Sequence, residues 1–188
     1  VFGGLVGEFV ADLHRSEGVD LRLGVGLDSI TAGADGRVAS VTLTDGSVVE
    51  TTLLVLGLGA APDLEWLVGS GLEIDNGVVC DETLQAAPGV VAAGDVANWF
   101  NPSFGERMRV EHWDNAIGQG EAAARCLLAL AADEPVAPFA SVPWFWSDQY
   151  DVGIQLAGRP AADGEIVVID GGPAERRFAV AFRRGDRC

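Results

Sequence analysis

Hydrophobic positions at the start of the chain follow a helical spacing. They recur at intervals of three or four residues and comprise Leu5, Val6, Phe9, Val10 and Leu13. Gly18, a residue type that commonly ends a helix, follows this stripe. Residues 4–17 are therefore predicted to form an amphipathic helix.

Shorter apolar segments with the composition of strands come next. They are rich in Val, Leu and Thr and cover residues 19–25, 28–32, 37–44 and 47–50. The pairs Asp35-Gly36 and Asp45-Gly46 separate the last three segments, and an Asp-Gly pair between such runs predicts a hairpin turn. We therefore expect a β-meander. Residues 53–57 are apolar almost throughout, which predicts a strand buried on both faces of a parallel sheet.

The pattern changes after Pro62 to short elements around one long helix. We predict a helix near residues 63–69, a short strand at 77–80 and a second buried strand at 90–94. Residues 111–131 are predicted to form the long helix, because one apolar stripe contains Ala116, Ala123, Cys126, Leu127 and Leu130.

The last part of the chain is separated from this helix by the Pro-Val-Ala-Pro stretch at residues 135–138, which predicts a linker. Beyond it, residues 150–156, 165–169 and 177–182 have strand composition and are joined by turns rich in Gly, Asp and Pro. They predict the beginning of an antiparallel sheet. No strand precedes the first helix and nothing caps the last strand, so we expect both ends to be cut from a longer protein.

Composition narrows the classes of partner. The 188 residues are 48% hydrophobic, but no apolar run approaches the roughly 20 residues that cross a bilayer. The net charge of −16 would repel nucleic acid and an anionic membrane surface, so neither is expected as a partner. Residues 1–150 carry this whole excess, with 22 acidic residues and six Arg, whereas residues 151–188 hold six of each.

The cysteines indicate no metal or disulfide chemistry within the chain. Cys80, Cys126 and Cys188 lie far apart in the sequence and form neither a C-x-x-C pair nor a zinc-ligand cluster. Such sparse usage favours a reducing cytoplasm. The absence of Lys beside 12 Arg, together with many Gly, Ala and Val, suggests a bacterial genome of high GC content.

Glycines at the ends of the two predicted buried strands are candidate ligand contacts. Gly57 and Gly59 follow the first of these strands, and Gly94 with Asp95 ends the second. Ligands bind at such strand ends, where glycine lets the backbone approach a cofactor and a carboxylate can accept hydrogen bonds from a sugar or ribityl hydroxyl. The alternatives are a tight turn at Gly57 and Gly59 and a turn cap at Asp95.

Two further groups of residues carry candidate chemistry. Glu111, His112 and Trp113 stand at the beginning of the long predicted helix, where backbone N–H groups favour anionic or carbonyl oxygens, although a lone His and Trp can equally be packing residues. Four of the chain's 14 aromatic residues fall within seven positions: Trp144, Phe145, Trp146 and Tyr150. This cluster predicts a core, an interface or a platform for a flat cofactor ring.

Five strings containing these residues resemble one family in their order and spacing. They are L-G-L-G-A-A-P-D at 56–63, G-V-V-C-D-E-T-L at 77–84, V-V-A-A-G-D-V-A at 90–97, M-R-V-E-H-W-D-N-A-I-G-Q-G at 108–120 and F-W-S-D-Q-Y at 145–150. Together they resemble the flavin-dependent ferredoxin reductases of the pyridine nucleotide-disulfide reductase superfamily. That branch serves two-iron ferredoxins in aromatic dioxygenase and cytochrome P450 systems.

The resemblance implies an α/β fold of the flavoprotein type with two dinucleotide-binding domains, of which this chain would be a part. Residues 1–61 would be the back half of the three-layer, Rossmann-like NAD(P)-binding domain with its β-meander. Residues 62–134 would return to the FAD-binding domain. Residues 135–188 would begin an α+β C-terminal domain. Family members carry two G-x-G-x-x-G fingerprints, and neither is present in this sequence.

The resemblance also implies cofactors and residue roles. Hydride would pass from NAD(P)H to FAD, and electrons would pass on to a two-iron ferredoxin. Asp95 beside Gly94 would bond the ribityl chain, and Gly57 with Gly59 would contact the dinucleotide. His112 and Trp113 would line the flavin, with Glu111 on the nicotinamide side and Trp146 near the isoalloxazine ring.

Rival interpretations remain at this point. They are a flavin NADH oxidase, a rubredoxin or nitrite reductase component, and an inactive truncated module that only binds a partner.

A cluster of Arg near the C-terminus is a candidate ferredoxin-docking patch, with a local charge of +3, and the alternative is a scattered, solvated surface. Its members are Arg176, Arg177, Arg183, Arg184 and Arg187.

We predict that the 188-residue chain expressed alone is inactive and does not retain FAD. The Gly-rich loop that would cradle the pyrophosphate at a helix N-terminus is absent from its sequence, so the remaining contacts lack the strongest anion site. Gel filtration followed by absorbance spectroscopy checks this. Stoichiometric flavin that stays with the chain would contradict it.

Overall fold

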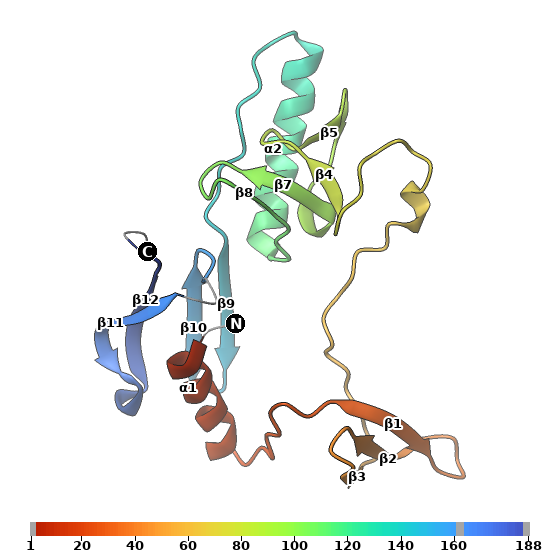
Figure 1. The fold of residues 1–188 in the computed structure, drawn as a ribbon, viewed down its shortest axis with the longest axis vertical. Coiled ribbons are helices and arrows are strands. Elements are labelled where there is room, and N and C mark those ends of the chain that lie inside the picture. The colour runs from red at the N-terminus through yellow and green to blue at the C-terminus, as the bar shows by residue number, and fades with distance from the viewer. Residues whose placement is uncertain (1–2, 161–163, 186–188) are drawn as a thin grey trace. The chain divides into compact units, whose positions relative to one another are not determined.

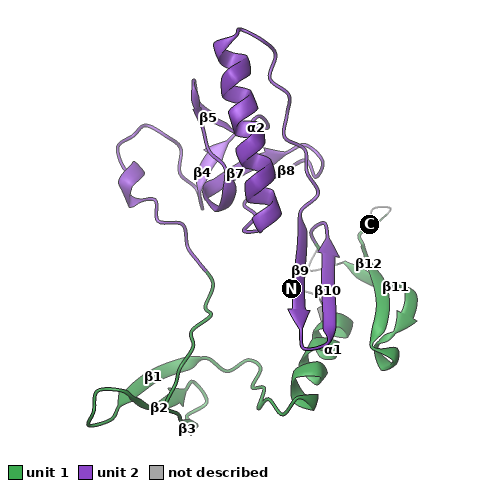
Figure 2. Ribbon diagram, turned by 180° about the vertical axis from the view of Figure 1, so that it is seen from behind, with its two compact units in different colours: residues 1–59, 160–188 green, residues 60–159 purple. Residues whose placement is uncertain are grey.

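The computed structural model describes residues 3–160 and 164–185, which form two compact units. The first unit comprises residues 1–59 and 160–188, and the second comprises residues 60–159 (Figure 2). Among the described residues no helix is long and apolar enough to cross a membrane.

The first unit begins with the predicted helix and β-meander (Figure 1). Its elements are α1 (Gly3–Ser16), β1 (Leu27–Ala32), β2 (Val38–Leu43) and β3 (Val48–Glu50), and the three strands pair antiparallel in that order. Asp35 and Asp45 set the two turns because each carboxylate accepts the backbone N–H two residues on, at 3.1 and 2.9 Å. The prediction of a strand at residues 19–25 is wrong: this segment consists of turns and irregular backbone.

The first unit also contains an antiparallel pair from the other end of the chain. β11 (Glu165–Gly172) and β12 (Arg177–Arg183) are joined by a 3-10 turn at Pro173–Glu175. The predicted strands at 165–169 and 177–182 are thus confirmed. On α1, Val6, Ala11 and Leu13 are buried, and the Phe9 ring meets Phe178 of β12 edge-on, with centroids 5.0 Å apart.

The two apolar runs predicted as buried parallel strands do not form them. Residues 53–57 have no regular structure, and Leu53 and Val55 are 75% and 82% exposed. Of residues 90–94, only Val90–Val91 is a strand, β6, and it pairs antiparallel with β5 (Gln85–Ala87). A strand buried on both faces needs neighbouring strands and covering helices. Residues 53–57 have no strand partner among the described residues, and β6 pairs with β5 in a sheet of two short strands.

The second unit is built around a small mixed sheet and a long helix. β4 (Val78–Cys80) pairs parallel with β7 (Ala97–Asn101), which pairs antiparallel with β8 (Glu106–Met108). A 3-10 turn, η1 (Glu65–Leu67), occupies the predicted helix near 63–69. The other elements are η2 (Gly94–Val96), α2 (Trp113–Ala131), β9 (Trp144–Gln149) and β10 (Val152–Ala157), and β9 pairs antiparallel with β10.

The core of this unit lies around β7, a strand that the sequence pattern did not reveal. Trp99 and Ala97 of β7 are fully buried, as is Leu84, and Cys80 of β4 is 1% exposed. The predicted helix at 111–131 is confirmed as α2, which contributes Ala123 to this core.

The Pro-rich segment after α2 is irregular but is held by the core. Residues 132–143 contain no helix or strand. Trp99 Nε1 donates to the Phe139 carbonyl at 3.3 Å, and Asn101 Nδ2 donates to the Ser141 carbonyl at 2.8 Å. The Phe139 N–H in turn donates to the Glu82 carbonyl at 2.7 Å. These contacts determine where β9 begins, directly after the segment.

Stability is predicted to fall between about pH 9 and pH 11 through Cys80. Burial raises the pKa of this thiol from its ordinary value of 9.0 to about 11. Above pH 9 the unfolded chain therefore loses a proton that the folded chain keeps, which favours unfolding. Urea unfolding between pH 9 and pH 11 measures how the free energy of unfolding changes with pH. Lys side chains, which would titrate in the same range, are absent from the sequence. Cys80→Ala should flatten part of the pH dependence, because burial also raises the pKa of the Cys126 thiol. An unchanged slope would contradict the assignment to Cys80.

Candidate functional site

The Gly94–Asp95 turn lies against the first half of α2. Gly94 has φ +76°, and a Cβ at this position would lie 3.4 Å from the Ala116 Cβ of the helix. Its backbone N–H donates to Gln119 Oε1 at 2.7 Å. Gly94 is buried by this contact, whereas the Asp95 side chain is exposed. The turn therefore presents a carboxylate to solvent close to the helix N-terminus.

The first turn of α2 gathers three of the predicted site residues. His112 is the N-cap, in an extended conformation and without a side-chain capping bond, and Trp113 is the first helical residue. Glu111 precedes them and is paired with Arg109 at 2.6 Å. Because the first N–H groups of a helix have no partner within the helix, this end favours anionic or carbonyl oxygens.

Indole rings of β9 adjoin this helix end and remain exposed. The Trp144 and Trp146 rings stack with centroids 5.0 Å apart, and Trp146 meets Trp113 edge-on at 6.3 Å. Trp113 is 70% exposed, and Trp146 is 41% exposed. The cluster is thus a surface feature in this chain. Beside it, the His112 ring packs against Phe145 with centroids 5.7 Å apart.

Several buried polar atoms at the same helix end find no hydrogen-bond partner among the described residues. On and next to the first two turns of α2 they are His112 Nδ1, Asp114 Oδ1, Asn115 Oδ1 and Gln119 Nε2. Leaving a buried polar atom unsatisfied costs about 1–3 kcal/mol, so each of these atoms requires a partner from outside the described residues, such as ordered water or a polar ligand. With a close-packed glycine turn and exposed indoles beside it, this region suits a flat, polar cofactor such as FAD.

The remaining predicted residues, Gly57 and Gly59, belong to the first unit. They lie in the exposed irregular segment, and Gly59 has φ +86° with open space around the position of a Cβ. α2 and its site residues belong to the second unit. Their contact with a dinucleotide stays a prediction.

Sequence reasoning missed two residues that organise the site. Gln119 accepts the Gly94 N–H, and Arg109 Nη1 donates to the Asp95 carbonyl at 3.0 Å. Both residues stand in the string at 108–120, but neither residue type signals such a role by itself. Their partners lie 25 and 14 positions away in the sequence, so only the folded chain shows them.

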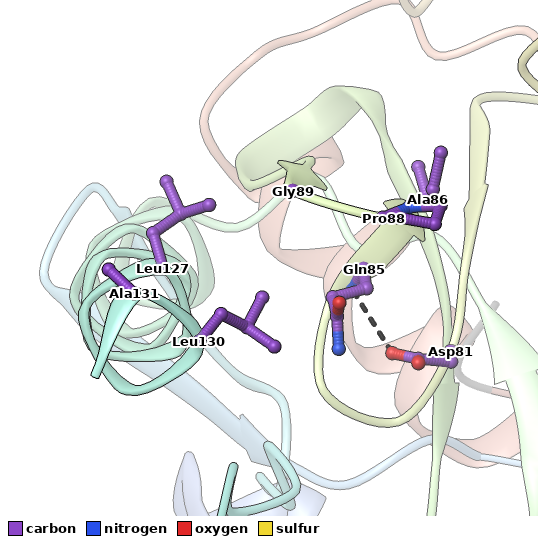
Figure 3. A pocket seen from close by; sticks show the side chains of 9 residues that line it. Asp81, Gln85, Ala86, Pro88, Gly89, Leu127, Leu130 and Ala131 are labelled. Carbon is purple, nitrogen blue, oxygen red and sulfur yellow. Dashed lines mark hydrogen bonds between the residues drawn. The ribbon is translucent and has the colours of Figure 1, made fainter. Parts of the chain in front are cut away.

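A separate apolar hollow of about 700 Å³ lies between the β5–β6 turn and the second half of α2 (Figure 3). Leu127, Leu130 and Ala131 line it from the helix. The Asp81 carboxylate at its edge is already used, because it accepts the backbone N–H groups of Thr83 and Gln85. The hollow contains none of the predicted site residues. The described part of the chain also has no cluster of three His, Cys, Asp or Glu side chains that could hold a metal ion.

Comparison with known families shows to which family the chain belongs. Residues 1–120 match the family described as pyridine nucleotide-disulphide oxidoreductase, and residues 144–188 match the one described as reductase C-terminal. The chain belongs to the pyridine nucleotide-disulphide oxidoreductase family. It is thus a piece of an oxidoreductase fold, and the family and its ferredoxin reductases imply FAD and NAD(P)H as cofactors.

Curated relatives match the sequence over nearly the whole chain. The chain is 38% identical over 98% of its length to the ferredoxin reductase subunit of 5,5'-dehydrodivanillate O-demethylase from Sphingobium. It is 33% identical over 97% of its length to putidaredoxin reductase from Pseudomonas putida. The chain spans only 44% and 42% of the lengths of these two proteins.

Solved structures confirm the fold class. The ferredoxin reductase for the CYP199A2 system from Rhodopseudomonas palustris superposes with a TM-score of 0.85 and 34% identity. A covalent putidaredoxin reductase–putidaredoxin complex superposes with a TM-score of 0.84 and 31% identity. Each comparison covers 96% of this chain, and 43% and 42% of the respective structures. The chain is therefore a partial α/β flavoprotein fold of the ferredoxin reductase type.

We predict that the stacked indoles produce an exciton-coupled band in the far-ultraviolet circular dichroism of the chain. The Trp144 and Trp146 indoles lie 5.0 Å apart with their planes 24° from parallel, so their transition dipoles are close and skewed and should couple; Trp146→Phe should remove the band. Trp66→Phe is the matched control, because Trp66 is also exposed but has no ring contact among those described. A band that survives Trp146→Phe would contradict the stacked geometry.

Proposed function

We propose that this chain is part of an FAD-dependent reductase that passes electrons from NAD(P)H to a two-iron ferredoxin. The observation that carries the proposal is the exposed Asp95 beside a close-packed Gly94, at a helix end that also holds unsatisfied polar atoms and exposed indoles. The names of the relatives support the choice of acceptor, since they include ferredoxin reductases of oxygenase systems.

The site residues divide into a flavin side and a nicotinamide side. Asp95 accepts hydrogen bonds from ribityl hydroxyls, and the positive φ of Gly94 favours glycine in the turn, where a Cβ would contact Ala116 at 3.4 Å. His112 and Trp113 line the flavin ring, with Trp146 packed nearby. Glu111 faces the nicotinamide. When bound, the flavin supplies the hydride-accepting atom and the ability to release electrons singly.

We also propose to which domain each part of the chain belongs. Residues 1–61 form the back part of the NAD(P)-binding domain, with Gly57 and Gly59 near the dinucleotide. Residues 62–134 complete the FAD-binding domain, and residues 135–188 begin the C-terminal domain. The reductase works in the bacterial cytoplasm, as the sparse cysteines favour; Cys80 and Cys126 are free and buried.

The deciding experiment uses the reductase that contains this chain. Under NAD(P)H it should reduce a two-iron ferredoxin rapidly while producing little hydrogen peroxide. Fast peroxide production without ferredoxin reduction would favour a flavin NADH oxidase. Faster reduction of rubredoxin or of a nitrite reductase would identify that protein, and not a two-iron ferredoxin, as the electron acceptor. Absence of flavin from the purified reductase would favour the interpretation as an inactive module that only binds a partner.

Removing the Asp95 carboxylate should weaken flavin binding more than NAD(P)H binding. A lost hydrogen bond to a charged group costs about 1.5–3 kcal/mol, which corresponds to a tenfold or larger drop in FAD affinity. Measuring the dissociation constant of FAD for Asp95→Ala checks this. Asp95→Asn keeps one acceptor oxygen and should recover part of the affinity. Equal affinity in all three proteins would make Asp95 a turn cap only.

The Arg cluster of the first unit is proposed to steer the ferredoxin, which the resemblance to the family implies to be acidic. Arg176, Arg177, Arg183 and Arg184 are exposed, while Arg187 lies outside the described residues. Arg183 also pairs with Glu165 at 2.6 Å, so part of its charge is already balanced. Complementary charge acts mainly on the association rate, which is about 10⁵ to 10⁶ M⁻¹s⁻¹ without steering.

Reversing the charges of Arg183 and Arg184 should slow ferredoxin reduction at low salt and flatten its salt dependence. Reduction of a small neutral acceptor should stay unchanged, because it needs no steering. Arg37→Glu is the matched control, an exposed Arg of the same unit outside the cluster. Stopped-flow kinetics across a salt series checks the prediction. Equal effects of the two changes would assign the cluster to ordinary surface.

A further inference from the structure

Arg109 is the one described residue whose side chain contacts both sides of the proposed cofactor site. Its Nη1 donates to the Asp95 carbonyl at 3.0 Å and lies 2.6 Å from Glu111 Oε1. Its Nε donates to Asn76 Oδ1 at 3.3 Å. One guanidinium thus joins the turn that carries Asp95, the residue before the α2 N-cap, and the loop that precedes β4.

The surroundings of Arg109 hold its side chain in one position. The side chain is only 13% exposed. The position of a Cβ on Gly77 would lie 3.1 Å from Arg109 Cδ and 2.7 Å from the Val96 carbonyl oxygen. Gly77 therefore allows the arginine stem and the η2 turn to pack against the same stretch of backbone. The planar guanidinium of arginine holds several donors in fixed directions, so it suits this position better than the flexible ammonium group of lysine.

We propose that Arg109 is a positioning residue that couples the flavin-side residue Asp95 to the nicotinamide-side residue Glu111, an inference that rests on the proposed function. The guanidinium fixes the Asp95 backbone through its carbonyl and orients the Glu111 carboxylate through the ion pair. Its described partners are all protein groups. Removing the guanidinium should weaken the binding of FAD and of NAD(P)H together. The loss of binding should exceed that caused by an equally destabilising change elsewhere in the unit.

Arg107 supplies a matched control two residues earlier. Its Nη1 donates to the carbonyl oxygens of Cys80 and, at 3.0 Å, of Asn98. It therefore also ties backbone segments of the same unit together. None of its described contacts involves Asp95, Glu111 or α2. A purely structural effect of losing a guanidinium should appear equally in Arg107→Gln and Arg109→Gln.

The test compares these variants in the reductase that contains this chain. Arg109→Gln should raise the dissociation constant of FAD roughly tenfold and also raise KM for NAD(P)H, whereas kcat changes less. Arg107→Gln should lower the melting temperature of the flavin-free protein at least as much and leave both binding constants unchanged. Arg109→Lys should restore part of the FAD affinity because it keeps one cationic donor.

A double-mutant cycle with Glu111→Gln tests the coupling itself. If Arg109 acts on NAD(P)H through Glu111, then adding Glu111→Gln to Arg109→Gln should raise KM little further. Additive effects on KM, or equal effects of Arg107→Gln and Arg109→Gln on FAD affinity, would overturn the inference. Failure of the wild-type reductase to bind flavin would instead overturn the proposed function, so the two failures are distinguishable.

Discussion

The contact between the Gly94 turn and α2 is the constraint on which the candidate site depends. Gly94 adopts a positive φ and lies so close to Ala116 that a Cβ would meet the helix at 3.4 Å. The Gly94 N–H is tied to Gln119 of the same helix. Since η2 leads directly into β7, this contact aligns the buried strand with the helix. The position of Asp95 beside the α2 N-terminus follows from it.

The second unit also determines where the indoles lie. Trp99 and Asn101 of β7 hold the irregular segment after α2 through the carbonyls of Phe139 and Ser141. β9 begins directly after that segment, and its Trp146 meets Trp113 at the helix end. The same core strand therefore organises both the carboxylate turn and the aromatic surface. That is why polar and aromatic groups from distant parts of the sequence gather at one helix end.

Features with local causes could be predicted from the sequence, and features with tertiary causes could not. The apolar spacing of α1 and α2 and the Asp-Gly turns of the meander act within a few residues, so these elements were found. The apolar runs at 53–57 and 90–94 resemble strands buried in a parallel sheet, which need neighbours on both sides. Residues 53–57 have no strand partner among the described residues, and Val90–Val91 pairs antiparallel with β5 in a sheet of two strands. The roles of Arg109 and Gln119 depend on contacts across 14 and 25 positions and carry no local signal.

Hydrogen–deuterium exchange of the reductase, measured with and without FAD, tests whether the flavin lies against the Gly94–Asp95 turn and the first turn of α2. We expect FAD to slow exchange at residues 94–97 and 111–116 and to leave the β1–β3 meander unchanged. Protection confined to other segments, with residues 94–97 and 111–116 unaffected, would contradict this placement of the flavin.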